Sequence, residues 1–290
     1  MSTAKAQIRK TQAAYDIRLN RVVDYIHNHL EEDIRFEDLA TVACLSSWHW
    51  HRIYTAMRGE TIATTIRRLR LSRAAERLAN SQIPIGDVAE RAGYGSADAF
   101  ARAFRQVYGK SPTDYRLNGS HAAYKAALRA HDSAGFTVSI ETLTPVRCAS
   151  IAHTGSYMQI DRAMSQLFAA LATQGGMASD QQMLAMFYDD PDLIPITELR
   201  SRACSPVAEG VSLTAPIEEA ILRGGPYARL RYRGPYADMK NAYRWLLGAW
   251  LPQSGYEPDD APVFEAYLNS PLEVRPTELL TDIHLPLKAS

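Results

Sequence analysis

The chain has 290 residues and a formal net charge of zero, with 32 Lys and Arg against 32 Asp and Glu. This length leaves room for two domains of ordinary size. Residues 1–130 hold 20 basic and 13 acidic residues, a net of +7, and residues 131–290 hold 12 and 19, a net of −7. A basic half suits a polyanion, whereas an acidic half excludes that kind of partner and suits a neutral or cationic ligand.

The cysteines and the apolar segments exclude several classes of protein. Cys44, Cys148 and Cys204 are too few and too widely spaced for a zinc site or a disulfide framework. We expect Cys44 to be a small buried side chain in a helix. No run of 18 apolar residues indicates a membrane span, and the N-terminus does not read as a secretory signal. The sequence therefore indicates a cytoplasmic protein with no membrane partner, metal or cofactor.

One stretch of the chain occurs twice, 49 to 50 residues apart: Phe36 to Gly59 and Ile85 to Gly109. In both copies, apolar residues at helical spacing predict a short helix, a turn and a longer helix. The residues expected to pack are Leu39, Ala40, Ala43, Trp50, Ile53, Tyr54 and Met57 in the first copy, and Val88, Ala89, Ala92, Ala99, Phe100, Ala103, Phe104 and Val107 in the second. Each copy reads as a helix-turn-helix, whose second helix enters a DNA major groove.

Turn chemistry supports this interpretation. Ser47 and Ser96 are good N-cap residues for the second helix of each copy, and Gly93 permits the backbone conformation that closes the helix before it. The residues left on the outer faces are Trp48, His51, Arg52 and Arg58 in the first copy, and Ala97, Asp98, Ala101, Arg102 and Arg105 in the second.

A helical pattern from Ile62 to about Ala79 lies between the copies, and Pro84 begins the second one. Such a helix would hold the two units a fixed distance apart. If both second helices enter one face of DNA, they must lie about 34 Å apart.

Residues from about 19 to 117 resemble the DNA-binding domain of the AraC/XylS family of transcription regulators. The resemblance rests on both copies and on the closing segments Tyr108-Gly109-Lys110-Ser111-Pro112 and Tyr115-Arg116. It implies an all-α domain that reads double-stranded DNA, and a regulator that contacts RNA polymerase.

The family's DNA-contacting positions fall on two sets of residues: Trp48, His51 and Arg52 in the first copy, and Ala97, Asp98, Ala99, Ala101 and Arg102 in the second. Arginine can make a bidentate contact to guanine, whereas alanine cannot hydrogen-bond a base edge. We therefore expect the first copy to read bases and the second to position the protein through Arg102 and Arg105 on phosphates. Two alternatives stay open: Trp48 packs against the first helix, and Arg105 is a solvated charge.

The second half of the chain is also duplicated. Alternating residues such as Val138 and Ile140, and later Leu230 and Tyr232, predict strands. A shift of 79 to 80 residues places Gly155-Ser156-Tyr157 on Gly234-Pro235-Tyr236 and Thr197-Glu198-Leu199 on Thr277-Glu278-Leu279. Each unit reads as strand, strand, turn, helix, strand, strand. Two such units would pair their sheets about a pseudo-two-fold axis, and a groove along that axis is the natural place for a ligand.

This half resembles the GyrI-like effector-binding domain, through motifs such as Tyr232-Arg233-Gly234-Pro235-Tyr236 and Pro262-Val263-Phe264-Glu265. An AraC-type domain followed by a GyrI-like domain is the order of Rob-like regulators. The fold class expected is an all-α double helix-turn-helix domain followed by a duplicated α+β domain. We divide the chain into an N-terminal extension (1–18), a DNA-binding domain (19–117), a linker (118–135) and an effector-binding domain (136–290).

Glu265 breaks the symmetry of the second duplication, because its repeat partner is Ala185. In the family, a glutamate in this position lies at the floor of the groove. A carboxylate buried among aromatic residues favours a bound cation or takes up a proton, and aromatic walls add cation–π attraction. The candidates for those walls are Tyr157, Tyr188, Tyr236, Trp245 and Tyr267. The alternative is that Glu265 is paired internally, for instance with an arginine.

The leading hypothesis is therefore a transcription regulator that binds a lipophilic or cationic small molecule, as in multidrug sensing, and is not an enzyme. Two alternatives remain. Some GyrI-like domains resemble hydrolases, in which Glu265 would act as the general base. The gyrase-inhibitor relatives imply instead that the second half binds a protein.

Overall fold

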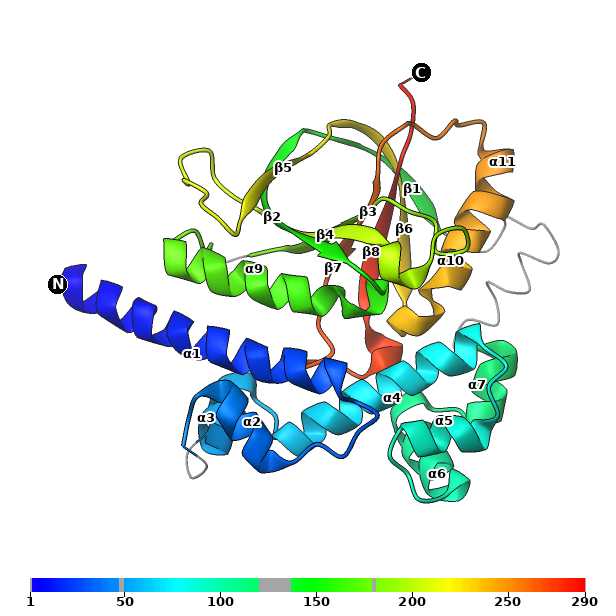
Figure 1. Cartoon of the computed structure of the whole chain (residues 1–290). Coiled ribbons are helices and arrows are strands. Elements are labelled where there is room, and N and C mark those ends of the chain that lie inside the picture. Colours follow the sequence, from blue (N-terminus) through cyan, green and yellow to red (C-terminus); the bar gives the residue numbers. More distant parts are fainter. Residues whose placement is uncertain (1, 47–49, 120–136, 179–180, 290) are drawn as a thin grey trace.

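The computed structural model describes residues 2–46, 50–119, 137–178 and 181–289, with side chains from Ala13 onward. A helical domain lies on one side of the molecule and a curled sheet with its own helices lies on the other (Figure 1). The helices of the first domain are α1 (Ser2–Asn28), α2 (Phe36–Ala43), α3 (Trp50–Arg58), α4 (Ile62–Asn80), α5 (Ile85–Arg91), α6 (Ala97–Tyr108) and α7 (Pro112–Asn118).

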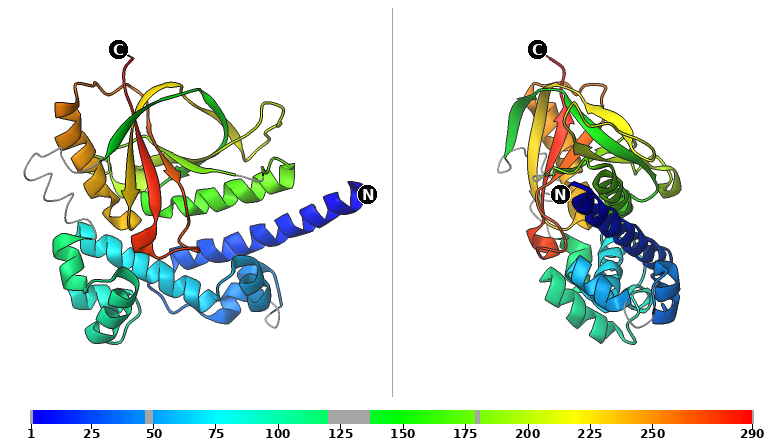
Figure 2. Two further views of the ribbon diagram at one scale, coloured as in Figure 1. Left: turned by 180° about the vertical axis from the view of Figure 1, so that it is seen from behind. Right: turned by 90° about the vertical axis from the view of Figure 1, so that its left-hand side faces the viewer.

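The two predicted helix-turn-helix units are α2 with α3, here called the first head, and α5 with α6, the second head. The long helix α4 joins them, as its apolar spacing predicts, and both heads lie on the side of α4 away from the sheet (Figures 1 and 2). Ser96 caps α6, since its hydroxyl accepts a hydrogen bond from the backbone N–H of Ala99 at 3.2 Å. The matching cap expected from Ser47 falls outside the described residues.

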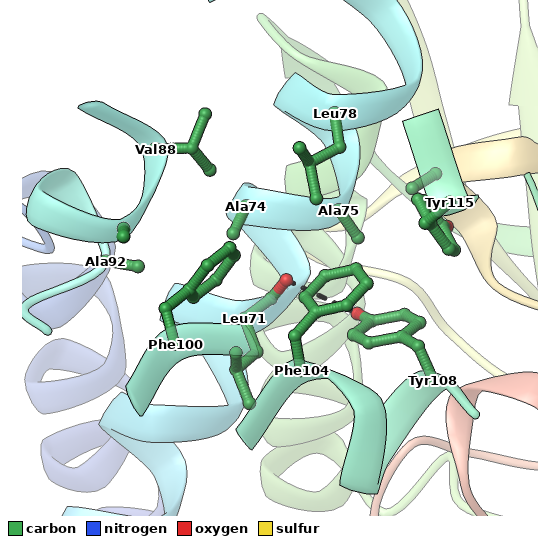
Figure 3. Packing of buried hydrophobic residues seen from close by; sticks show 12 residues of the cluster. Leu71, Ala74, Ala75, Leu78, Val88, Ala92, Phe100, Phe104, Tyr108 and Tyr115 are labelled. Atoms are coloured by element: carbon green, nitrogen blue, oxygen red, sulfur yellow. Dashed lines mark hydrogen bonds between the residues drawn. The ribbon is translucent and has the colours of Figure 1, made fainter. Parts of the chain in front are cut away.

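The buried residues place the two heads in register. Trp50 and Tyr54 fill the core of the first head, and Phe100 and Phe104 fill the core of the second, 50 residues later (Figure 3). The short helices match at 49 residues instead, through Ala40 and its counterpart Ala89. The second head therefore has one more residue in its turn, which explains the two repeat lengths in the sequence.

Cys44 differs from its prediction. It is exposed and ends α2 in the left-handed conformation, with φ +49°, where the second head has Gly93 with φ +77°. In both heads the next residue closes the turn, as Leu45 N–H donates to the Ala40 carbonyl and Tyr94 N–H to that of Ala89. This motif requires a left-handed residue, which glycine adopts more easily than any other. Cys44 is therefore a helix-ending residue and not a core side chain.

The second domain is built on one eight-stranded antiparallel sheet of order β1-β6-β8-β7-β3-β4-β2-β5. The strands are β1 (Val138–Leu143), β2 (Val146–Thr154), β3 (Met183–Phe187), β4 (Arg200–Pro206), β5 (Glu218–Leu222), β6 (Gly225–Arg233), β7 (Val263–Tyr267) and β8 (Leu280–Pro286). The first unit contributes helix α9 (Ile160–Gln174), and the second contributes α10 (Met239–Trp245), a π-helical segment (Leu246–Trp250) and α11 (Leu251–Ser254). Short 3₁₀ turns precede the helices: η1 (Tyr157–Gln159) before α9 and η3 (Tyr236–Asp238) before α10. Two more precede β4 and β8: η2 (Ile196–Glu198) and η5 (Pro276–Glu278).

The duplication predicted for this half is confirmed by its hydrogen bonds. The N–H of Gly155 donates to the Leu199 carbonyl at 2.8 Å, and that of Gly234 donates to the Leu279 carbonyl at the same distance. The two units meet where β3 pairs with β7, and Ala185 lies directly opposite Glu265. Since these residues are each other's repeat partners, the pseudo-two-fold axis passes between them.

Helices cover one of the two faces of the sheet, and the strand register shows which face each side chain is on. Successive side chains of a strand alternate between the faces. Ala203, which pairs with Ala185, packs with α9 residues such as Leu167, and Ile283, opposite Glu265, packs with α10. The opposite face holds a separate cluster that includes Leu184, Met186 and Phe264. Glu265 therefore points to the helix-covered face.

The two domains are in contact along several elements. The N-terminal helix α1 lies beside α9, with Asp24 bound to Arg162 at 2.8 Å (Figure 1). Ala237 of the sheet domain packs in the buried cluster of the second head and α7, together with Tyr108 and Tyr115. The boundary that we placed after residue 18 falls inside α1, which continues into the core of the first head through Leu19.

Replacing Cys44 by glycine should stabilise the helical domain. A left-handed L-residue costs roughly 1–2 kcal/mol, of which the added freedom of glycine in the unfolded chain cancels part. We expect the free energy of unfolding in urea to rise by roughly 0.5–1 kcal/mol for Cys44→Gly. The matched variant Gly93→Ala should lower it by more than roughly 1 kcal/mol, because an L-residue is strained at φ +77° and its Cβ would also meet the Arg70 guanidinium. A change in the free energy of unfolding with the same sign for Cys44→Gly and Gly93→Ala would contradict this account.

Candidate nucleic-acid interface and effector site

The outer face of the first recognition helix, α3, carries two of the three predicted contact residues. His51 and Arg52 are exposed in its first turn, whereas Trp48 lies outside the described residues. Neither side chain is hydrogen-bonded to the described part of the chain. Both are therefore available to a ligand.

The second recognition helix, α6, presents the residues expected of it. Ala97, Asp98, Arg102 and Arg105 are exposed, and Ala101 is half-buried. Neither arginine forms an ion pair with a described residue. The buried residues Tyr54 and Phe104 are equivalent in the two heads and lie 50 residues apart. The same shift makes Arg52 equivalent to Arg102. The two heads thus carry one arginine at an equivalent place.

Arg58, at the end of α3, does not face outward as expected. Its guanidinium donates to Asn20 Oδ1 at 2.5 Å and to the Asp16 carbonyl at 3.3 Å, and it lies 3.4 Å from the Asp16 carboxylate. These partners are on α1, which the sequence did not place against α3. Arg58 therefore attaches the recognition helix to α1 and is not a DNA contact in this arrangement.

Glu265 occupies a buried polar site at the centre of the sheet. It is 5 % exposed. The Tyr243 hydroxyl donates to Oε1 at 2.7 Å, and the Tyr267 hydroxyl donates to Oε2 at 2.9 Å. No described residue forms an ion pair with this carboxylate, so the internal arginine partner of the alternative interpretation is not found. Burial raises the pKa of Glu265 to about 7, and the two tyrosine hydrogen bonds only partly oppose that rise.

Further tyrosines surround this carboxylate. The ring of Tyr236 meets that of Tyr267 edge to face at 5.6 Å, and burial and the charge of Glu265 raise the pKa of Tyr236. Tyr157 lies at the equivalent turn of the first unit, where its hydroxyl donates to the Asp189 carbonyl at 2.9 Å and its ring contacts Phe187. A cation entering here would meet one carboxylate and several electron-rich ring faces.

Tyr243, which holds Glu265 most closely, was missed by the sequence interpretation. It follows Tyr236 by seven residues, two turns along the η3–α10 segment. That spacing places both residues on one face of a helix and could have identified it.

Two predicted wall residues are wrong. Trp245 is fully buried and packs with Leu230, Ile283 and the rest of the core under α10. Tyr188 lies one residue out of phase with Ala185 and Phe187, and its hydroxyl contacts the Met186 sulfur at 3.9 Å, on the opposite face of the sheet. Strand alternation therefore places Tyr188 on the face opposite to Glu265, and helix packing places Trp245 in the core.

Comparison with known families identifies both halves of the chain. Residues 136–288 match the GyrI-like small molecule binding domain, and residues 39–118 match a helix-turn-helix domain. The first match covers more than half of the sequence. The chain therefore belongs to the GyrI-like family, with a helix-turn-helix domain preceding the family domain.

Individual relatives define the helical half. The chain is 30 % identical over 98 residues to the regulatory protein SoxS of Salmonella typhimurium, covering 34 % of this chain and 92 % of SoxS. It is 36 % identical over 102 residues to the probable transcriptional regulator LumQ of Photobacterium leiognathi, covering 34 % of this chain and 41 % of LumQ. The match thus spans less than half of LumQ. Both relatives are named as regulators, and together with the helix-turn-helix match this confirms the AraC-type assignment of the helical domain.

One solved structure is similar over most of the chain. The EcmrR–DNA complex has a TM-score of 0.49 and 11 % identity, covering 89 % of this chain and all of the EcmrR chain. Separately, no helix among the described residues is long and apolar enough to cross a membrane.

The raised pKa of Glu265 predicts a pH-dependent stability. Because the folded-state pKa lies above the ordinary value, the protonated form favours folding, and that contribution is lost as pH rises from about 4.5 through about 7. We expect the difference in unfolding free energy between Glu265→Gln and the wild type to grow by up to roughly 3 kcal/mol between pH 5 and pH 8.

The measurement is urea unfolding of both proteins at four pH values. Tyr243→Phe supplies the matched variant, because losing a hydrogen bond to the carboxylate should move the wild-type transition to higher pH. A difference that stays constant with pH would contradict a raised pKa.

Proposed function

We propose that the chain is a DNA-binding transcription regulator whose sheet domain senses a lipophilic cation. The observation that carries the sensing role is the buried carboxylate of Glu265, which has hydrogen-bonding tyrosines but no cationic partner among the described residues. A carboxylate in that setting gains most from a positively charged ligand. Tyr157, Tyr236, Tyr243 and Tyr267 supply aromatic surface for the rest of the molecule.

DNA binding is assigned to the exposed faces of α3 and α6. Arg52 and His51 offer hydrogen bonds to base edges in the first head. In the second head, Arg102 and Arg105 can contact phosphates. The alanines beside them cannot hydrogen-bond a base edge. The net positive charge of residues 1–130 supports DNA binding by this half of the chain.

The regulatory output follows from these two activities. A small molecule bound near Glu265 can alter DNA binding or contact with RNA polymerase only if it distinguishes two states of the protein. We therefore expect an effector to change transcription from a promoter that carries the operator. RNA polymerase is the natural partner for such a protein.

Arg52→Ala and Arg102→Ala provide a matched test of the two heads. If Arg52 reads a base, its loss should weaken binding to the selected operator by roughly 1–3 kcal/mol and relax specificity at one position. Arg102→Ala should weaken all sequences alike. Selection from a randomised DNA pool followed by fluorescence anisotropy measures both effects. An unchanged base preference in Arg52→Ala would show that this residue contacts only phosphate.

The charge of Glu265 can be tested with two ligands of similar shape. Glu265→Gln should weaken binding of the cationic dye crystal violet at least tenfold, because the ion pair is lost in a site with little water. Binding of the neutral leuco form of the same dye should change little. Equal losses for both forms would indicate a change in shape and not in charge.

A further inference from the structure

Asn20 is a buried side chain at the contact between the two domains. It is 8 % exposed and lies on α1. Its Nδ2 donates to the Ser165 carbonyl of α9 at 3.0 Å, and its Oδ1 accepts from the Arg58 guanidinium at 2.5 Å. One amide therefore joins a helix of the sheet domain to the last residue of the first recognition helix.

The other end of this connection reaches Glu265. Tyr267, which donates to the carboxylate, also packs against the cluster that contains Leu167 of α9. Ser165 is on the same helix. A continuous set of contacts thus runs from Glu265 through Tyr267 and α9 to Asn20, and from there to Arg58 and α3.

The contact around Asn20 can change its geometry. It is lined with polar pairs, such as Asp24 with Arg162 and His27 with Asp161. A cavity of about 400 Å³ adjoins it, bounded by α1, α9 and Arg58. Polar pairs and unfilled space can rearrange at lower cost than close-packed apolar side chains.

The second head is attached differently. Ala237, in the turn before α10, is buried among residues of α4, α6 and α7, including Tyr108 and Tyr115. Met158, in the turn before α9, packs on the same cluster, and Ser156 donates to Glu76 of α4 at 3.4 Å. This shared apolar core fixes the second head and the C-terminal half of α4 to the sheet domain, whereas Ile62 and Leu69 of α4 pack with the first head.

We propose that Asn20 is a positioning residue that transmits occupancy of the Glu265 site to the first head, while the second head stays fixed. The inference rests on the proposed sensing function. A ligand that displaces Tyr267 from Glu265 changes how α9 packs on the sheet. Because Asn20 is bonded both to α9 and to Arg58, a movement of α9 alters the placement of α3 relative to α6, and thus the match of both heads to one operator.

The test compares Asn20→Asp with Asn28→Asp in the full chain. Asn20→Asp keeps an acceptor for Arg58 but removes the donor to Ser165. Asn28→Asp adds the same charge to the same helix and keeps its acceptor for Arg162, which Asn28 Oδ1 now contacts at 3.1 Å. Both variants add a negative charge beside an arginine, and only Asn20→Asp removes a hydrogen-bond donor to α9. They also differ in exposure, since Asn20 is buried and Asn28 is exposed.

The readout is the distance between two spin labels in a Cys44→Gly background: Thr41→Cys in α2 of the first head, and Thr113→Cys in α7, which packs on the second head. Glu265→Gln serves as the perturbation, because it removes the same negative charge that a cation would neutralise. We expect it to shift the distance by roughly 1–2 Å. The shift should persist with Asn28→Asp and disappear with Asn20→Asp. Arg58→Ala, which breaks the other end of the connection, should also abolish it.

Two results would overturn the inference. One is that Glu265→Gln does not change the label distance. The other is that the change in label distance survives in Asn20→Asp or in Arg58→Ala, provided that urea unfolding shows the variant to be folded. Crystal violet binding, measured separately by its fluorescence, decides the sensing function. If the dye does not bind, sensing of this cation fails, while the label distances still decide whether Asn20 transmits a change at Glu265.

Discussion

The sheet domain is built around one buried carboxylate, that of Glu265, which forms no ion pair with a described residue. A perfectly symmetric duplication would place the same side chain on both strands at the pseudo-two-fold axis, where Ala185 and Glu265 are directly opposite. Two carboxylates at that spacing would repel each other, and both could not ionise at neutral pH. Alanine on one strand leaves room and a single charge, so that the axis itself becomes the site. The tyrosines around it satisfy the oxygens without neutralising them.

The helical domain follows the same principle of duplication with unequal chemistry. Arg52 and Arg102 are exposed at equivalent positions of the two heads. The heads differ at their ends, because the position of Tyr108 in the second is taken by Arg58 in the first. Tyr108 is buried and stacks on Phe104, whereas Arg58 bonds to α1. That difference places the end of α6 in the apolar core shared with the sheet domain, whereas the end of α3 makes polar contacts with α1.

The architecture was predictable from the sequence because it rests on local patterns. Helical and alternating periodicities, caps and repeat lengths identified both duplications and paired Glu265 with Ala185. The family resemblance, and not these patterns, implied that Glu265 lies at the floor of a groove. The errors concern residues whose surroundings come from distant parts of the chain. Trp245 could be a wall or a core residue until the packing of α10 on the sheet was known. Arg58 turned inward because α1 supplies Asn20 and Asp16, which no local pattern relates to it. Tyr188 is different, since the alternation of β3 already assigned it to the opposite face.

The two kinds of contact between the domains decide which head is able to move. An apolar core excludes water and loses packing energy with small displacements, so Ala237 holds the second head in one place. Hydrogen bonds such as that from Asn20 to Ser165 can exchange partners with water or with one another, and the cavity beside them provides space. The head whose arginine and histidine are suited to reading bases is the one on the adjustable contact. In the proposed function, a sensor arranged in this way would change the placement of the base contacts proposed for the first head, while the phosphate contacts proposed for the second head would keep the protein on DNA.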